Sequence, residues 1–173
     1  FLYIKGNAYT IYPASTTKLL TILYARTLLP LDKVITPGNE LEMVGPNSSV
    51  AYIKEHHRLT VEQLIEGMLL PSGNDAAHVL AAAGGYVLKP DAADGKEAVS
   101  VFMKGMNNYA RSIGLVGSVF INPDGYDNPE HYSTLEDMAI VARNAYKDEI
   151  IRKYSCMPSD EVTYASGHIM NWS

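Results

Sequence analysis

Residues 12–21 read Tyr-Pro-Ala-Ser-Thr-Thr-Lys-Leu-Leu-Thr. Ser15 and Lys18 are three residues apart in this stretch, so in a helix they share one face and the lysine amine can reach the serine hydroxyl. Pro13 marks the expected helix start. The following residues up to Leu29 are largely apolar, as in a helix buried inside a domain. Because burial favours the neutral amine, the pattern predicts a serine nucleophile with a lysine as its base.

A second interpretation of the same stretch needs no chemistry. Ser15, Thr16 or Thr17 caps the helix, and Lys18 extends its amine to water. A Ser-x-x-Lys pattern alone does not decide between the two, so a further motif is needed.

The sequence offers a second polar motif, Ser72-Gly73-Asn74, 57 positions after Ser15. Upstream, Thr60 and Gln63 form a predicted capping box for a helix that begins at Val61. Pro71 ends that helix. Ser72 and Asn74 therefore fall on a corner between two helices, where both polar side chains can point the same way. A plain Ser-Gly-Asn turn is the alternative.

Other expected elements follow from periodicity and turn residues. Asp75 is predicted to cap a helix that Gly84-Gly85 ends. The remaining predictions are strands at 1–4, 8–12, 33–36, 49–53 and 161–164, a helix capped by Asp94 with Glu97 that ends at Gly114, a loop-rich segment at 114–132, and a helix opened by a capping box of Ser133 with Glu136.

Together the two motifs match the signature of penicillin-binding proteins and serine β-lactamases. The wording of residues 13–18 and 70–77 closely resembles the bacterial low-molecular-mass penicillin-binding proteins that are serine-type D-alanyl-D-alanine carboxypeptidases. The resemblance covers nearly the whole chain. Its further stretches are Met106-Asn107, Ala110, Gly114-Leu115, residues 120–125, residues 131–134 and Asp137-Met138-Ala139.

The resemblance implies an activity and roles for four residues. Ser15 is the expected nucleophile and Lys18 its expected base; Ser72 would relay a proton, and Asn74 would orient Lys18 or the substrate amide. The reaction would remove the terminal D-alanine of a peptidoglycan stem pentapeptide, β-lactams would acylate the same serine, and neither cofactor nor metal is implied.

The family's third motif, Lys-Thr-Gly, does not occur in these 173 residues. We therefore expect residues 1–173 to be a single incomplete transpeptidase-like domain that lacks its C-terminal strands. Such a fragment should be nearly inactive alone, because the missing strand supplies an oxyanion donor and a carboxylate anchor. The expected fold is α/β (α+β) and β-lactamase/transpeptidase-like, mostly its helical half with remnants of the antiparallel sheet.

Two other functions remain as alternatives. A serine β-lactamase shares acylation, but Glu130 and Glu136 lack the Asn four residues on that class A enzymes of this kind have. A non-catalytic penicillin-binding or sensor protein would keep the fold for binding only. The presence of all four motif residues disfavours the second alternative.

Composition limits the partners. Fourteen Lys and Arg against 19 Asp and Glu give a net charge of −5, which disfavours nucleic-acid binding. Cys156 is the single cysteine, so no intrachain disulfide forms, and a buried or idle thiol is expected. No stretch is apolar enough to span a bilayer and no signal peptide is visible. The resemblance places the protein outside the cytoplasm in the cell envelope, with any membrane anchor outside this chain.

The histidines offer no ligand spacing. His56-His57 lies in a polar segment, where solvent exposure is expected, and His78, His131 and His168 are scattered along the chain.

Overall fold

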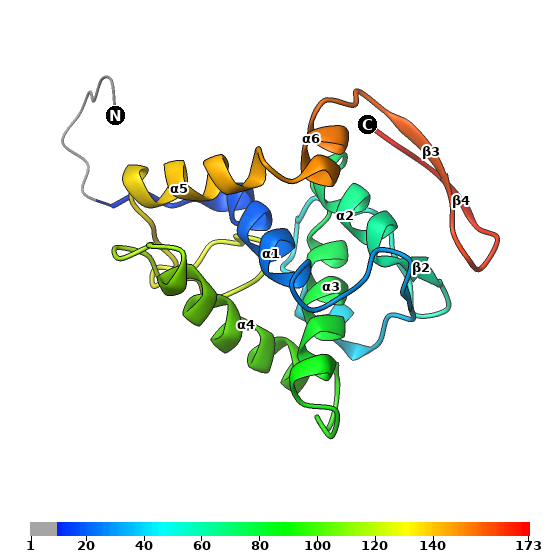
Figure 1. Cartoon of the computed structure of the whole chain (residues 1–173). Helices are drawn as coiled ribbons and strands as arrows, with labels where there is room; N and C mark the ends of the chain where they lie inside the picture. The colour runs from blue at the N-terminus through cyan, green and yellow to red at the C-terminus, as the bar shows by residue number, and fades with distance from the viewer. Residues whose placement is uncertain (1–9) are drawn as a thin grey trace.

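The computed structural model describes residues 10–173, so the strand predicted at 1–4 and the start of the one at 8–12 lie outside the described residues. The elements of this part of the chain are η1 (Ala14–Thr16), α1 (Thr17–Ala25), β1 (Val34–Ile35), η2 (Asn39–Met43), β2 (Leu59–Thr60), α2 (Val61–Leu69), α3 (Asn74–Leu88), α4 (Gly95–Ser112), α5 (Leu135–Ala145), α6 (Glu149–Ser155), β3 (Asp160–Thr163) and β4 (Ile169–Trp172). Helix α3 runs through the middle, in contact with α1, α2 and α4 (Figure 1).

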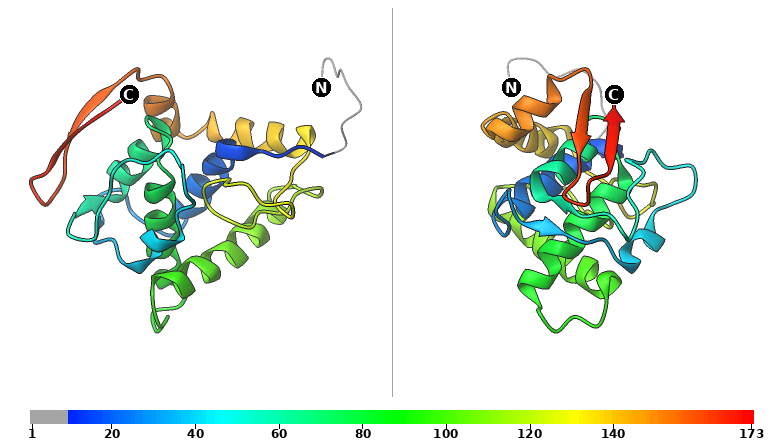
Figure 2. Two further views of the ribbon diagram at one scale, coloured as in Figure 1. Left: turned by 180° about the vertical axis from the view of Figure 1, so that it is seen from behind. Right: turned by 90° about the vertical axis from the view of Figure 1, so that its right-hand side faces the viewer.

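Within residues 10–173 the strands form two short antiparallel pairs. Val34 of β1 faces Thr60 of β2, and Asp160 of β3 faces Trp172 of β4. The β3–β4 hairpin lies at one side of the molecule (Figures 1 and 2). It is fastened there by the Trp172 indole, which donates to the Ala51 carbonyl at 3.2 Å. The expected α/β class, mostly helical with small antiparallel sheets, is confirmed.

Helices α3 and α4 pack closely through two glycines. The sequence predicts that Gly84-Gly85 ends α3, but the helix continues to Leu88. A Cβ at Gly85 would collide with the Ala98 backbone, and one at Gly84 would come within 2.6 Å of the Phe102 ring. The two glycines therefore allow α3 and α4 to pack closely, because glycine has no side chain to keep the helices apart.

The starts of α2, α4 and α5 follow their predicted capping residues with one correction. Thr60 and Gln63 form the predicted capping box of α2, and Asp94 accepts the expected bond from the Glu97 amide at 2.8 Å. Helix α5, however, is capped by Thr134, which accepts from the Asp137 amide at 3.1 Å, and not by Ser133. The predicted start is therefore one residue too early.

Asp75 is not the cap of α3, and residues 49–53 are not a strand. The Asp75 carboxylate lies in the first turn of α3, where its two oxygens accept from the amides of Ala51 and Ile53, each at 2.8 Å. These contacts occupy amides that strand pairing requires, so the segment packs beside α3 without joining a sheet.

Replacing Asp75 with alanine should destabilise the fold strongly. The amides of Ala51 and Ile53 would lose their buried acceptors, and a buried donor without a partner costs about 1–3 kcal/mol. We expect the free energy of unfolding to fall by about 3–5 kcal/mol for Asp75→Ala, and by less for Asp75→Asn, which keeps one acceptor. Urea denaturation followed by circular dichroism measures this. A loss under about 1 kcal/mol for Asp75→Ala would contradict the assignment.

Burial differs from expectation at two residues. Cys156, predicted to be a buried or idle thiol, is exposed and so is not buried, while its being idle stays a prediction. His57, expected to be exposed like His56, is 1% exposed. Its ring stacks on His168 at 4.6 Å between centroids, so a hairpin distant in sequence covers it. Within residues 10–173, no helix is both long and apolar enough to cross a bilayer.

Candidate active site

Ser15 and Lys18 lie at the junction of η1 and α1. The sequence predicts one α-helix from Pro13, but a 3-10 turn precedes α1, and within it Ala14 takes a φ of 47°, outside the right-handed helical region. Ser15 is exposed, whereas Lys18 is only 2% exposed. The Lys18 amine lies 3.0 Å from the Ser15 hydroxyl. Neither η1 nor α1 has a side-chain cap, so capping with a solvated lysine does not describe this site.

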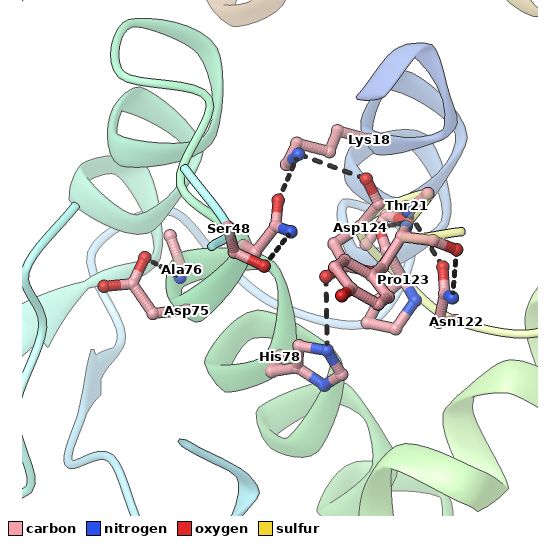
Figure 3. A network of polar contacts seen from close by, with 12 residues as sticks. Lys18, Thr21, Ser48, Asp75, Ala76, His78, Asn122, Pro123 and Asp124 are labelled. Atoms are coloured by element: carbon pink, nitrogen blue, oxygen red, sulfur yellow. Dashed lines mark hydrogen bonds and ion pairs between the residues drawn. The ribbon is translucent and has the colours of Figure 1, made fainter. Parts of the chain in front are cut away.

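Four oxygen atoms surround the Lys18 amine. The carbonyl of the Asn74 side chain lies at 2.7 Å and the backbone carbonyl of Asp124 at 3.1 Å, while the Ser15 and Ser72 hydroxyls lie at 3.0 and 3.3 Å. Figure 3 shows the amine placed opposite the Asp124 carbonyl. The partners thus divide into two carbonyls and two hydroxyls.

This division determines what a neutral Lys18 amine does. A carbonyl oxygen only accepts hydrogen bonds. The carbonyls of Asn74 and Asp124 therefore accept hydrogen bonds from the two N–H groups of a neutral amine. Its remaining electron pair then faces the side of the hydroxyls, which can donate. The geometry therefore fits an amine that receives a proton from Ser15 or Ser72.

Burial makes the neutral form accessible. Loss of solvent lowers the pKa of Lys18 from 10.5 to about 8, although the negative charges of Asp124 and Asp75 act in the opposite direction. A lysine with this pKa is partly neutral near pH 8 and can serve as a base there.

Ser72 and Asn74 approach from the α2–α3 corner. Ser72 takes a φ of 57° and its hydroxyl donates to the Ser15 hydroxyl at 3.1 Å. A Cβ on Gly73 would lie 2.7 Å from the Gly67 carbonyl oxygen, so only glycine fits at position 73. Asn74 opens α3, and its amide nitrogen donates to the Ser48 hydroxyl at 3.0 Å, which turns its oxygen toward Lys18. Left-handed residues such as Ser72 carry backbone strain, a common feature of functional sites.

A tight loop at residues 122–126 closes the other side of the site. The Asn122 side chain accepts from the Gly125 amide at 2.8 Å and donates to the Tyr126 carbonyl at 2.8 Å. Gly125 has a φ of 79°, and a Cβ there would collide with the Ala14 carbonyl. The loop therefore lies directly against the turn that carries Ser15.

His131 ties this region to α1. Its Nδ1 accepts from the Ile121 amide at 3.2 Å, which leaves the proton on Nε2, 2.9 Å from the Thr17 hydroxyl. Burial lowers the pKa of His131, so the ring stays neutral.

A cleft of about 300 Å³ opens in front of Ser15. Its walls come from residues 12–15, residues 124–128, and the polar side chains of Ser49, Asn74 and His131. The described residues contain no group of three or more His, Cys, Asp or Glu side chains arranged to hold a metal ion.

The structure brings the four expected residues, Ser15, Lys18, Ser72 and Asn74, into one cluster. Nothing in the sequence predicts the Asp124 carbonyl as the second acceptor of the amine. The Asn-Pro-Asp-Gly sequence at 122–125 predicts a turn, but it does not predict which backbone carbonyl points at a lysine. Ser48, His78 and His131 carry no sequence signal for their positions.

The arrangement of elements matches solved enzymes. The Streptomyces K15 DD-transpeptidase superposes with a TM-score of 0.85 and 29% identity, covering 99% of this chain and 66% of that one. The D-alanyl-D-alanine carboxypeptidase of Mycobacterium tuberculosis superposes with a TM-score of 0.74 and 26% identity, covering 93% of this chain and 57% of that one. The fold is therefore that of the DD-transpeptidases and DD-carboxypeptidases.

The chain belongs to the D-alanyl-D-alanine carboxypeptidase family, peptidase family S11, whose pattern matches residues 1–173. It is 32% identical to the D-alanyl-D-alanine carboxypeptidase DacF of Bacillus subtilis over 160 residues, 89% of this chain and 38% of that protein. It is 31% identical to DacC of Escherichia coli over 170 residues, 92% of this chain and 40% of that protein. The chain thus spans about two fifths of the length of these relatives.

Proposed function

We propose that the protein acts as a serine-type D-Ala-D-Ala carboxypeptidase that removes the terminal D-alanine from peptidoglycan stem pentapeptides. The observation that carries the proposal is the position of the Lys18 amine. It lies 3.0 Å from the Ser15 hydroxyl, and two carbonyl oxygens accept hydrogen bonds from its N–H groups. Membership of the carboxypeptidase family supports the substrate class.

In the acylation step, Ser15 Oγ attacks the carbonyl carbon between the two D-alanines and its proton passes to Lys18 Nζ. The carbon–nitrogen bond then breaks, and the leaving amine of D-alanine takes the proton that Lys18 received from Ser15. Ser72 supplies the path for this proton, because its hydroxyl lies 3.1 Å from Ser15 and 3.3 Å from Lys18. Water hydrolyses the acyl-enzyme and restores Ser15.

Asn74 holds the amine in this scheme. Its side-chain oxygen at 2.7 Å is the nearest partner of Lys18, and Ser48 fixes its orientation. A developing alkoxide at Ser15 also lies near the N-terminus of α1, where the helix dipole favours negative charge.

The proposal extends to partners and location. β-Lactams should acylate Ser15, since their strained amide occupies the place of the D-Ala-D-Ala bond. A peptidoglycan substrate implies an extracytoplasmic, secreted or membrane-associated protein with a role in cell-wall metabolism and cell shape. We also propose that residues 1–173 are one part of a longer transpeptidase-like domain, which the partial coverage of the K15 enzyme supports.

Release of D-alanine from diacetyl-Lys-D-Ala-D-Ala tests the proposed function. The full-length protein should release D-alanine from this peptide but not from the matched peptide that ends in L-alanine. Covalent penicillin labelling without D-alanine release would instead identify a penicillin-binding sensor. Rapid penicillin turnover without D-alanine release would identify a β-lactamase.

The rate of acylation should depend on pH through Lys18. Below pH 8 the amine is mostly protonated and cannot accept the Ser15 proton, so the rate should rise about tenfold per pH unit and level off above its pKa of about 8. Labelling by a fluorescent penicillin between pH 5.5 and 9.5 measures this. A rate that stays constant across this range would contradict a base with that pKa.

A further inference from the structure

Behind Lys18 lies a pair of buried ionisable side chains that the scheme above does not use. His78, on α3, is 3% exposed, and Asp124, in the loop at 122–126, is 1% exposed. His78 Nε2 lies 3.5 Å from Asp124 Oδ2, a contact drawn in Figure 3. Among the described residues, His78 Nδ1 has no hydrogen-bond partner, so Asp124 is the polar group that this side chain meets.

Burying two polar side chains costs free energy unless they interact favourably with each other or with a third polar group. An apolar pair of similar size would fill the same space at less cost. The third group here is Lys18, because the backbone carbonyl of Asp124 accepts from its amine at 3.1 Å.

The side chain and the carbonyl of Asp124 act on Lys18 in different ways. The carboxylate makes contacts at both oxygens: Oδ1 accepts a hydrogen bond from the Tyr126 amide at 3.1 Å, whereas Oδ2 has no hydrogen bond among the described residues and lies 3.5 Å from His78 Nε2. These contacts fix the peptide whose carbonyl meets the amine. The negative charge also opposes the effect of burial on Lys18.

Titratable groups around this unit come from several elements. Asp124 and Asp75 act on Lys18, and Glu40 acts with His78 from the side of η2. His131 faces Asp124 from the loop that follows. Although burial alone raises it, the pKa of Asp124 is held below its ordinary value by His78, so the carboxylate is charged whenever Lys18 titrates.

We propose that Asp124 and His78 are positioning residues of the candidate base: His78 holds the Asp124 carboxylate, which fixes the Asp124 carbonyl as the second acceptor of the Lys18 amine, so that the amine's electron pair faces Ser15 and Ser72. This inference rests on the proposed roles of Ser15 and Lys18, and it assigns to a buried histidine a part in the reaction without any contact with substrate.

Four variants separate positioning from mere stability in the full-length protein. Asp124→Asn keeps the shape and removes the charge; His78→Leu removes the polar contact; His78→Gln keeps an N–H near Asp124. Glu130→Gln is the matched control, because it also removes one negative charge but at an exposed residue on the neighbouring loop. Each is labelled with a fluorescent penicillin across pH, and folding is checked by circular dichroism.

His78→Leu and Asp124→Asn should lower the high-pH plateau of the labelling rate about ten- to a hundredfold, the cost of a catalytic group displaced by about 1 Å. His78→Gln should stay within about threefold of the wild type, and Glu130→Gln should equal it. Asp124→Asn should also move the acid limb to lower pH, since the charge that favours protonated Lys18 is gone. A purely structural role would change the melting temperature but neither the plateau nor the acid limb of the folded protein.

Direct titration of Lys18 gives a readout that needs no activity. In protein labelled with ¹³C-lysine, the Lys18 side-chain signal, assigned by its absence in Lys18→Met, should titrate at lower pH in Asp124→Asn and unchanged in Glu130→Gln. Identical Lys18 titrations and identical plateaus in wild type, Asp124→Asn and His78→Leu would overturn the proposal. If the wild type is not labelled at any pH, the proposed function fails, while the titration still decides whether Asp124 acts on Lys18. Asp124→Asn carries the test alone if His78→Leu does not fold.

Discussion

Replacing Ser15 with alanine is expected to reduce covalent labelling of the full-length protein by penicillin about 10⁴-fold or more, as removal of a nucleophile does in other serine enzymes. The variant should fold normally, because Ser15 is exposed and its hydroxyl contacts only Lys18 and Ser72 among the described residues. The loss therefore reports chemistry and not stability. Gel fluorescence after incubation with a fluorescent penicillin measures it.

Ser112→Ala is the matched control for this experiment. Ser112 is an exposed serine at the end of α4, and among the described residues its hydroxyl bonds only to the Tyr109 carbonyl. Its replacement should leave labelling unchanged. Undiminished labelling of Ser15→Ala would remove Ser15 from the role of nucleophile.

Replacing Lys18 with methionine should have the second largest effect. Methionine keeps an unbranched side chain in the buried space but has no basic nitrogen, so the Ser15 proton loses its acceptor. General-base catalysis contributes about 10²–10⁴-fold, and we expect the acylation rate to fall by this amount. The acid limb near pH 8 should disappear with it, because the group that titrates there is absent.

Two comparisons qualify the Lys18 experiment. Lys104→Met removes an exposed lysine on α4 and should change neither the rate nor the pH profile. Circular dichroism must show folded Lys18→Met, since the carbonyl oxygens of Asn74 and Asp124 lose a donor in this variant. A folded variant that keeps the wild-type rate and its dependence on pH would show that another group is the base.

Much of this site could be predicted because its key contacts are local. Ser15 and Lys18 meet through a spacing of three residues, and the contact survives although η1 is a 3-10 turn and not the α-helix that Pro13 predicts. The α2 capping box likewise involves only Thr60 and Gln63. Short-range geometry of this kind is encoded in neighbouring residues.

The contacts that the sequence did not predict join distant segments. Residues 49–53 have the composition of a strand, but the Asp75 carboxylate takes their amides, and no local pattern announces that pairing. Gly84-Gly85 is a helix stop in isolation and a helix contact once α4 packs on it. The polar neighbours of His57 predict an exposed side chain, but a hairpin more than a hundred residues later in the sequence buries it.

The same distinction applies to the second half of the site. Motif and resemblance predict that Ser72 and Asn74 lie with Ser15, but they predict no distances. The structure adds the Asp124 carbonyl, Ser48 and the His78 contact, which depend on how the loop at 122–126 and α3 pack around one amine. Tertiary packing of this sort decides which of several equivalent carbonyls becomes a ligand of the lysine.

The most direct test of the central claim is to locate the penicillin adduct in the full-length protein. After brief incubation near pH 8, proteolysis and tandem mass spectrometry should place the added penicilloyl mass on Ser15, in the peptide that also contains Lys18. An adduct on another residue such as Ser72, or no covalent adduct at any concentration of penicillin, would contradict a Ser15 nucleophile activated by a buried, neutral lysine.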